Sequence, residues 1–334
     1  MRNKNRLESK TLAELVDYYE MCNRSEGKSP NTVEWYSANL RQFRSYLRSR
    51  HLSEIIDRID IKTLREYMLY LQKRKRYEGS VFTPTQSGTL ASASVHGHVR
   101  TLRAFYSWLV REEILRKNIG KELKPPKILK KIIITLSDDE IRSIMTAFIP
   151  GKQTDQRNQT IFMLLFDTGI RIGELINLKM EDFRMNEGFL KVLGKGNKER
   201  LVPVGNNAQK ALQKYIFRFR PNPASQEITN VFLSANGYPL TANSMKLMFD
   251  RLAERAKVQR LHAHLCRHTF ATRYLINGGN VFTLQQILGH STLEMVKNYV
   301  NLASSHIAYE HQMFSPLDRF NLHKRQKIAG RCTP

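Results

Sequence analysis

The stretch FLKVLGKGNKERLVPV, residues 189–204, alternates apolar and polar side chains on either side of a Gly-Lys-Gly-Asn turn. Alternation with a period of two residues around a glycine-containing turn predicts a β-hairpin. The remaining patterned segments mostly repeat their apolar residues at helical spacing. This combination predicts a mainly α-helical fold with a small β-sheet in the second half of the chain.

Helical spacing also marks the first third of the chain. The segments concerned are residues 11–25, 33–50, 59–77 and 92–115. A stretch rich in Gly, Ser, Thr and Pro, residues 78–91, predicts a loop before the last of these helices. On that helix Arg100 and Arg103 lie among apolar residues. The pattern predicts a small helical domain with one basic side over residues 1–122.

A proline pair in LKPPKILKKIII interrupts the helical pattern, and four lysines surround it. Because proline cannot continue a helix, residues 123–136 are predicted to form an extended basic linker. The sequence of residues 137–140, Ser-Asp-Asp-Glu, has the spacing of a helix capping box. It begins a second domain over residues 137–303, and residues 304–334 form a basic tail.

Positive charge is the strongest compositional signal. The 334 residues exceed the usual size of one hydrophobic core, and 54 Lys and Arg against 30 Asp and Glu give a net charge of +24. Such an excess predicts a polyanionic partner, DNA or RNA, with a solvated basic surface or a membrane-surface protein as the alternative. No membrane span or signal peptide is predicted. Three widely spaced cysteines without a C-x-x-C pair favour a reducing cytoplasm.

Two polar motifs of the second domain lie at predicted turns. In DTGIRIGELINL, Arg171 follows a helix-ending glycine, and Glu174 lies one helical turn further on. Glu174 can therefore brace the guanidinium, although a surface ion pair is the alternative. Lys195, between two glycines at the hairpin tip, can reach into a groove and donate a proton. A solubilising turn lysine is the alternative there, and Lys198 is the second candidate.

Two further motifs carry histidines. In HAHLCRHTFATRYL, His264 and Arg267 project from one helix face and combine proton transfer with phosphate recognition. The His and Cys spacing matches no common zinc site, so no metal is predicted, and His268 is interpreted as a packed or phosphate-facing residue. In LGHSTLEMVKNYV, His290 stands near the start and Tyr299 near the end.

Together these motifs meet the needs of phosphodiester transfer. Two arginines neutralise the charge that builds on the non-bridging phosphate oxygens. A general base deprotonates the nucleophile, an acid protonates the leaving 5′ oxygen, and a nucleophile holds the cut strand covalently. Such a set requires no metal or other cofactor, because the arginines carry the charge that a metal would otherwise neutralise.

The four motifs TGIRIGEL, GKGNKERLVPV, HLCRHTFAT and LGHSTLEMVKNYV, in this order, resemble the signature of the tyrosine recombinase (phage integrase) family. The resemblance is closest to its Xer-like and transposon-encoded branch and covers residues 137–301. In the first domain, SPNTVEWYSANLRQFRSYL resembles the SAM-like helical core-binding domain of that family. The resemblance implies a site-specific recombinase that works through a 3′-phosphotyrosyl intermediate and a Holliday junction, without ATP or metal.

The resemblance also implies which residues contact the scissile phosphate. Arg171 and Arg267 match the two phosphate-binding arginines of the family. His290 matches a second phosphate-contacting histidine, which is tryptophan in some relatives. Glu174 matches a supporting acidic position.

Proton transfer and covalent attachment are implied at three other positions. Lys195 matches the hairpin lysine that acts as general acid toward the 5′ oxygen, and His264 matches the position linked to proton transfer with the nucleophile. Tyr299 matches the nucleophile itself. Cys266 stands where leucine is usual, and it is interpreted as a small hydrophobic residue.

The architecture implied by the resemblance is a C-shaped clamp of two domains around duplex DNA. Its partners would be double-stranded DNA with paired recombination sites, three further copies of the chain in a tetramer on DNA, and an accessory directionality factor. The free chain would be a monomer or weak oligomer in the bacterial cytoplasm, at the nucleoid, and residues 304–334 would dock on a neighbouring subunit. The residues expected to contact DNA are Arg100, Arg103, Lys124, Lys127, Lys198 and Arg200.

Three other classes of protein remain as alternatives. A type IB topoisomerase shares the chemistry but relaxes supercoils without exchanging strands. A non-catalytic DNA-binding regulator explains the charge and the helical domain. A ribonucleoprotein component explains the charge alone.

Overall fold

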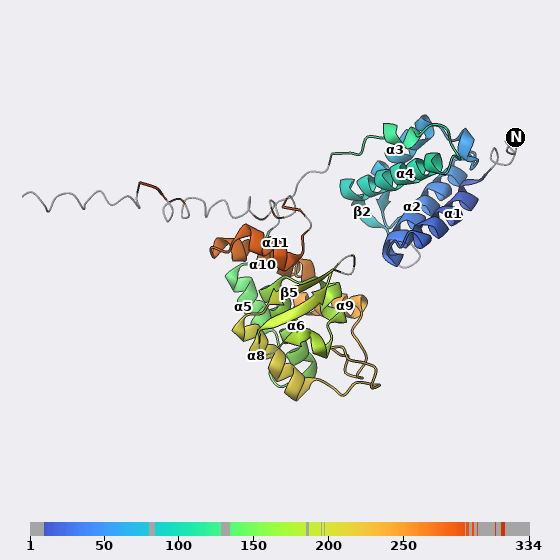
Figure 1. Ribbon diagram of the computed structural model, residues 1–334. Helices are drawn as coiled ribbons and strands as arrows, with labels where there is room; N and C mark the ends of the chain where they lie inside the picture. Colours follow the sequence, from blue (N-terminus) through green and yellow to red (C-terminus); the bar gives the residue numbers. More distant parts are fainter. Residues whose placement is uncertain are drawn as a thin grey trace, which may run out of the picture. The chain divides into compact units, whose positions relative to one another are not determined.

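The computed structural model describes the chain except for residues 1–9, 80–83, 128–133, 185–186, 195, 197, 291, 294–295, 297–298, 300–310, 312–314 and 318–334. The chain divides into two compact units, Met1–Lys131 (unit 1) and Ile132–Pro334 (unit 2). Both are built mainly from helices, and the predicted fold class is confirmed (Figure 1). Among the described helices, none is long and apolar enough to pass through a lipid bilayer.

Unit 1 is a bundle of helices α1 to α4 (Figure 1). The helices are α1 (Leu12–Ser25), α2 (Pro30–Ser49), α3 (Ile61–Lys73) and α4 (Ser92–Arg111), with the short 3-10 turns η2 (Ile56–Arg58) and η3 (Ile119–Glu122). Polar side chains cap the first three helices at Thr11, Ser29 and Asp60. Each cap supplies an acceptor for a backbone N–H group that the first turn leaves unpaired.

Aromatic side chains fill the core of unit 1. The Trp108 ring stacks on Phe105 with 5.8 Å between the ring centres, and Tyr19 lies 4.9 Å from the same indole. Such ring pairs stabilise a core beyond their apolar burial. The second tryptophan, Trp35, lies nearer the surface, where the guanidinium of Arg100 covers its ring at 4.9 Å.

One prediction for unit 1 is wrong. The segment predicted as a loop contains strand β2 (Gln86–Thr89), which pairs antiparallel with β1 (Lys75–Arg76). Helix α3 accordingly ends at Lys73, before the predicted end at residue 77. The backbone of Tyr77 is left-handed, with φ of 58°, and it helps to reverse the chain between the two strands. Since both strands are exposed along their length, no burial pattern marks them in the sequence.

Unit 2 combines helices with a small antiparallel sheet. The helices are α5 (Asp138–Thr146), α6 (Gln153–Thr168), α7 (Ile172–Asn177), α8 (Asn206–Lys214), α9 (Ala242–Arg255), α10 (Ala263–Ile276) and α11 (Val281–Leu288), with the 3-10 turn η4 (Met180–Asp182) and the short π-helix η5 (Tyr215–Phe219). The sheet contacts α7 and α11. Among the described residues, the sheet has the order β3 (Phe183–Arg184), β4 (Phe189–Leu193) and β5 (Glu199–Pro203).

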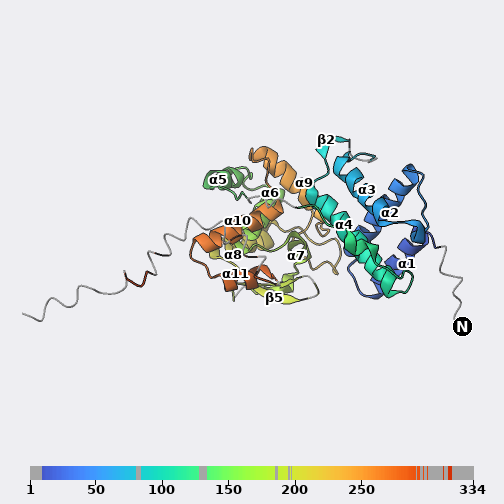
Figure 2. The same ribbon diagram turned by 90° about the horizontal axis from the view of Figure 1, so that it is seen from above.

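The local features that the sequence predicts for unit 2 are present in the structure. Ser137 and Glu140 form the capping box that begins α5. The predicted hairpin is the β4–β5 pair, in which Leu193 lies opposite Glu199. Helix α11 contacts β5, and the two lie side by side in Figure 2. The hairpin therefore adjoins the helix that leads to His290.

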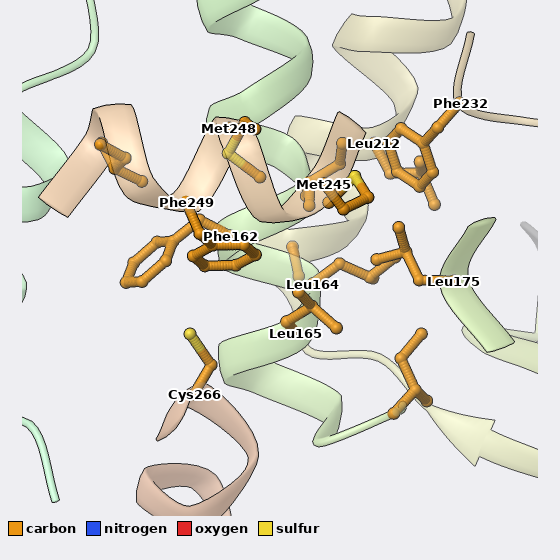
Figure 3. Close-up of a cluster of buried hydrophobic side chains, with 14 of the residues drawn as sticks. Phe162, Leu164, Leu165, Leu175, Leu212, Phe232, Met245, Met248, Phe249 and Cys266 are labelled. Carbon is orange, nitrogen blue, oxygen red and sulfur yellow. The ribbon is translucent and has the colours of Figure 1, made fainter. Parts of the chain in front are cut away.

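The core of unit 2 surrounds α6, which contacts α8 on one side and α10 on the other (Figure 1). Phe162, Leu164 and Leu165 of α6 are almost completely buried. Figure 3 shows the side chain of Cys266 pointing from α10 toward this cluster. Its thiol has no exposed surface, so Cys266 acts as the small apolar residue that the sequence predicts. This packing anchors α10, the helix that carries Arg267.

Candidate active site

Arg267 joins two helix ends at the candidate site. Only 3% of its surface is exposed. Its Nη1 donates to the carbonyl oxygen of Gly169 at 2.6 Å, and its Nη2 donates to the carbonyl oxygen of Leu288 at 2.8 Å and lies 2.9 Å from Nε2 of His290. Burial and the charge of Arg171 lower the pKa of Arg267 to about 10, which leaves it charged at neutral pH. A cation at the C-terminal carbonyls of α6 and α11 also complements their helix dipoles.

Left-handed glycines close both of these helices. Gly169 follows α6 with φ of 62°, and Gly289 follows α11 with φ of 61°. A Cβ at Gly169 would lie 2.4 Å from Cδ1 of Phe270, so the position has neither the backbone nor the space for another residue. These turns direct the residues that follow them, Arg171 and His290, toward Arg267.

Glu174 connects Arg171 to the hairpin. Its carboxylate accepts hydrogen bonds from Nη1 and the backbone N–H of Arg171, at 2.9 and 2.8 Å. It also accepts from both Nη atoms of Arg200, at 2.9 and 2.8 Å, while Nε of Arg200 donates to the carbonyl oxygen of Ile287. Burial acts to raise the pKa of Glu174, but the hydrogen bonds and charges of the two arginines outweigh it and hold the pKa below its ordinary value. The predicted brace between Arg171 and Glu174 is confirmed.

Tyr299 packs in a small apolar cluster, and only 4% of its surface is exposed. The other members of the cluster are Ala271, Leu275, Leu284, Leu288 and Val296. The Tyr299 hydroxyl lies 2.9 Å from Nδ1 of His268, and its ring is nearly parallel to that of His290 at 6.3 Å between centres. Burial raises the pKa of Tyr299, whereas the charges of Arg267 and Arg171 act to lower it. The hydroxyl therefore lies within electrostatic reach of both guanidinium groups.

The histidines of the site differ in their surroundings. His264 is exposed, and among the described residues no hydrogen bond joins it to Tyr299. Burial lowers the pKa of both His268 and His290 to about 4, so both are neutral at physiological pH. Because Arg267 can only donate, Nε2 of His290 accepts and the imidazole proton is on Nδ1. That Nδ1 is buried and lacks a hydrogen-bond partner in the described part of the chain.

The other candidate residues from the sequence differ in their exposure to solvent. The side chains of Arg100, Arg103, Lys124, Lys127 and Lys198 are exposed. Arg200, expected to contact DNA, instead has its guanidinium held by Glu174 and the Ile287 carbonyl, with only 14% of its side chain exposed. Lys195 lies outside the described residues, as does most of the tail over 304–334.

Sequence reasoning missed the position of one residue next to the predicted nucleophile. The sequence indicates a packed or phosphate-facing residue at His268, whereas the structure places its Nδ1 2.9 Å from the Tyr299 hydroxyl. A usable signal was its place one turn after His264, on the same face of α10.

The arrangement provides a hydroxyl, a neutral imidazole nitrogen at hydrogen-bond distance from it, and two guanidinium groups nearby. These groups can activate an oxygen nucleophile and stabilise an anionic phosphate that it attacks. Within the described residues, no three His, Cys, Asp or Glu side chains are grouped as metal ligands would be.

Comparison with known proteins gives matches to both units. A family model described as the phage integrase family matches residues 135–306, and one described as a phage integrase SAM-like domain matches residues 14–124. Tyrosine recombinase XerD of Staphylococcus aureus is 30% identical over 304 residues, which are 90% of this chain and 98% of that protein. XerD of Staphylococcus saprophyticus is also 30% identical over 304 residues, with the same coverage.

Solved structures share the fold at lower sequence identity. The Tn1549 transposon integrase in complex with transposon right end DNA has a TM-score of 0.69 at 21% identity, covering 92% of this chain and 100% of that one. XerH site-specific recombinase bound to difH substrate has a TM-score of 0.64 at 20% identity, covering 91% and 85%. A lambda integrase dimer bound to a core site has a TM-score of 0.64 at 20% identity, covering 88% and 78%. From the family matches and the similarity to XerD, we conclude that the chain belongs to the phage integrase family and is a tyrosine recombinase.

Proposed function

We propose that this tyrosine recombinase cuts and rejoins double-stranded DNA at specific sites through a covalent 3′-phosphotyrosyl link to Tyr299. One observation carries the proposal. The Tyr299 hydroxyl lies 2.9 Å from a neutral histidine nitrogen and in the electrostatic field of Arg267 and Arg171. A hydroxyl becomes an effective nucleophile when a base takes its proton and cations offset the charge of the phosphate under attack.

The proposed roles divide the reaction among the neighbouring side chains. Arg171 and Arg267 bind the non-bridging oxygens of the scissile phosphate, and His290 contacts the same phosphate. Lys195 protonates the leaving 5′ oxygen, and His264 takes part in proton transfer. The availability of Arg171 supports its role. Among the described residues, Nη1 is the one guanidinium nitrogen of Arg171 with a hydrogen bond, and the side chain is 32% exposed. That side chain can therefore turn a second edge to phosphate.

Covalent catalysis also accounts for the energy of rejoining. The phosphotyrosyl bond keeps the energy of the broken phosphodiester, so a 5′ hydroxyl from another strand can attack it directly. The proposed reaction consumes no ATP, and it exchanges strands in two pairs through a Holliday junction. The attack of each 5′ hydroxyl releases the Tyr299 hydroxyl for a new cycle.

The proposed partner is duplex DNA that carries paired recombination sites. The net charge of +24 and the exposed basic residues Arg100, Arg103, Lys124, Lys127 and Lys198 support it. The three structurally similar proteins named above are all described as complexes with DNA. We propose that a helical domain over 1–122 and a catalytic domain over 137–303, joined by the linker 123–136, enclose the duplex.

The proposed assembly is a homotetramer on DNA, with an accessory directionality factor, at the nucleoid of a bacterial cytoplasm. Residues 304–334 dock on the neighbouring subunit in this assembly. Truncation after residue 303 is expected to abolish cooperative binding to paired sites in a gel-shift assay. Cooperative binding that survives truncation would contradict the proposed docking.

Trapping on a nicked DNA substrate tests the proposed chemistry. The nick lets a short fragment diffuse away after cleavage, so the covalent complex accumulates and is seen as a slow band on a denaturing gel. The native chain and Tyr274→Phe are expected to form the adduct, because the Tyr274 ring packs on Phe270 and, among the described residues, its hydroxyl makes no hydrogen bond to the proposed site. Tyr299→Phe is expected to bind DNA and form none. An adduct with Tyr299→Phe, or none with the native chain, would refute the proposal.

A two-site assay separates recombination from topoisomerase activity. The native chain is expected to exchange DNA between two sites on a supercoiled plasmid that carries its target. Relaxation of plasmids without any exchanged product would favour a type IB topoisomerase instead.

A further inference from the structure

One guanidinium, that of Arg200 on β5, contacts several segments that carry the proposed catalytic residues. Its Nη1 and Nη2 donate to the two carboxylate oxygens of Glu174, at 2.9 and 2.8 Å, and its Nε donates to the carbonyl oxygen of Ile287 at 2.8 Å. All three nitrogens therefore have acceptors inside unit 2, and only 14% of the side chain is exposed. These contacts direct the side chain into the protein instead of toward DNA.

Two glycines let the backbone approach this guanidinium closely. A Cβ at Gly194 would lie 3.2 Å from Nη1 of Arg200, and a Cβ at Gly289 would lie 3.1 Å from its Cζ, Nε and Nη1. A residue without a side chain permits such an approach without displacing the guanidinium. Gly194 directly precedes Lys195 in the sequence, and Gly289 directly precedes His290. Arg200 therefore lies against the backbone that leads into two of the proposed catalytic residues.

The contact with Ile287 fixes the end of α11 together with Arg267. Arg200 binds the carbonyl oxygen of Ile287, and Arg267 binds that of Leu288, the next residue. Cations at the last carbonyls of a helix also complement its dipole. Two arginines from different elements, β5 and α10, thus hold consecutive carbonyls at the end of α11. The turn to His290 begins from this fixed end.

The carboxylate of Glu174 transmits the effect of Arg200 to Arg171. Glu174 accepts from Nη1 and the backbone N–H of Arg171, so an ionised carboxylate in a fixed place holds that guanidinium. The charged groups that face the carboxylate are Arg171 at the start of α7 and Arg200 on β5, and Arg267 on α10 lies within electrostatic reach. Burial acts to raise the pKa of Glu174, and the two arginines that bind it hold the pKa below its ordinary value. Loss of Arg200 would let the carboxylate take up a proton at a higher pH.

We propose that Arg200 is a positioning residue for DNA cleavage. It holds Arg171 in place through Glu174. It also fixes the backbone directly before Lys195 and His290. The assignment rests on the proposed function above, and in it Arg200 touches neither the DNA nor the nucleophile. Alignment of this kind matters because a misplacement of about 1 Å in a site can cost about 100-fold in rate.

Single-turnover cleavage of a nicked duplex by Arg200→Gln tests the assignment. Glutamine is polar, but it carries no charge and cannot donate to Glu174 and Ile287 through three nitrogens. The cleavage rate is expected to fall by about 100-fold. The affinity for uncut DNA and its dependence on salt are expected to stay near those of the native chain. Replacing a direct phosphate contact would instead lower the slope of the salt dependence by about one.

Two controls separate alignment from stability and from charge. Leu212→Ala empties a fully buried position on α8, which contacts α6 and η5, so it destabilises unit 2 through its core. Arg184→Gln removes a cation from β3 of the same sheet, where the ion pair with Glu187 is exposed. Each variant is assayed at a temperature at which thermal unfolding shows it to be folded. Both controls are then expected to cleave DNA at the native rate.

The pH dependence of cleavage supplies a readout that a structural role alone would not change. In the native chain the pKa of Glu174 lies below its ordinary value, so its protonation slows cleavage only below the ordinary carboxyl range. In Arg200→Gln the acidic limb of the log rate is expected to shift to higher pH, because one arginine fewer opposes burial. Arg200→Lys restores a charge without the planar fork. Its acidic limb is expected to return toward the native position, with a rate between those of the native chain and Arg200→Gln.

The possible outcomes distinguish this assignment from the proposed function. Native-like cleavage by folded Arg200→Gln, an equal loss of rate in folded Leu212→Ala, an unshifted acidic limb or a lower salt slope would each overturn the assignment and leave Tyr299 as the nucleophile. If Arg200→Gln failed to fold, Arg200→Lys would decide the matter, since cleavage at the native rate would overturn the assignment and slower cleavage with native DNA affinity would support it. A native chain that formed no adduct would overturn the proposed function, and the role of Arg200 with it.

Discussion

Replacing Arg200 by alanine is expected to destabilise unit 2 strongly, although Arg200 was predicted from the sequence to be a DNA contact. The substitution removes two hydrogen bonds to the carboxylate of Glu174 and one to the carbonyl oxygen of Ile287. Only 5% of the Glu174 side chain and 14% of the Arg200 side chain are exposed. The pair is therefore shielded from water, unlike most ion pairs on a protein surface.

The size of the effect follows from what remains around the carboxylate. Breaking a buried ion pair from one side costs about 3–5 kcal/mol, because the other charge stays buried. Glu174 keeps the guanidinium and backbone N–H of Arg171, so the lower end applies. We expect Arg200→Ala to lower the free energy of unfolding by about 3 kcal/mol at neutral pH. The folded-state pKa of Glu174 lies below its ordinary value, so this ion-pair stabilisation is present above that ordinary value and fades as pH falls through the folded-state pKa.

Urea unfolding measures the change in the free energy of unfolding of unit 2, and the tryptophan fluorescence of unit 1 serves as an internal reference. Both tryptophans belong to unit 1, so their fluorescence follows unit 1, while hydrogen exchange of peptides follows unit 2. The loss is expected in unit 2 alone. Arg184→Ala is the matched control, since its ion pair with Glu187 is exposed and contributes at most about 1 kcal/mol. An unchanged free energy of unfolding of unit 2 in Arg200→Ala would refute the reasoning. So would a double variant, Arg200→Ala with Glu174→Gln, whose loss of unfolding free energy equals the sum of the two single losses.

Three further predictions concern stability and reactivity. Gly169→Ala is expected to lower the free energy of unfolding by about 3 kcal/mol, because alanine strains a left-handed backbone and its Cβ clashes with Phe270. In the same urea titration, the control Gly173→Ala is expected to be neutral or stabilising, since a Cβ there meets nothing within 4 Å. Burial lowers the pKa of His98 from 6.5 to about 4, so unit 1 is expected to lose up to about 1.4 kcal/mol per pH unit from this residue as pH falls through that window. Tryptophan-monitored unfolding at pH 7 and pH 5 checks this, and an unchanged pH slope in His98→Phe would contradict it. Burial raises the pKa of Cys266 to about 12, so thiol reagents are expected to label this residue only in urea. Peptide mass spectrometry identifies the labelled cysteine, and labelling of Cys266 in the native chain would disprove its burial.

Local signals were sufficient for much of the fold. The hairpin followed from alternation around a glycine turn, and the start of α5 followed from the spacing of Ser137 and Glu140. The brace between Arg171 and Glu174 followed from their separation by one helical turn. In each case, the residues that make the interaction are close in sequence, so their spacing alone determines the contact.

Contacts between distant segments were beyond sequence reasoning. Arg200 and Glu174 are 26 residues apart and meet only because the hairpin adjoins α7 and α11. His268 and Tyr299 are 31 residues apart. They meet because Tyr299 packs in one apolar cluster with Ala271 and Leu275 of α10. A charged residue on a hairpin has the same sequence pattern whether it faces DNA or a buried carboxylate. The family resemblance identified the candidate site residues, but their hydrogen bonds required the three-dimensional fold.

The chemical identity of the amino acid linked to DNA tests the central claim most directly. The trapped complex from a nicked substrate can be digested with nuclease and protease, and the peptide that retains a nucleotide can be sequenced by mass spectrometry. We predict a nucleotide attached through its 3′ phosphate to the oxygen of Tyr299, with a free 5′ hydroxyl on the released strand. A nucleotide on any other residue, or a 5′ phosphate link, would contradict the account.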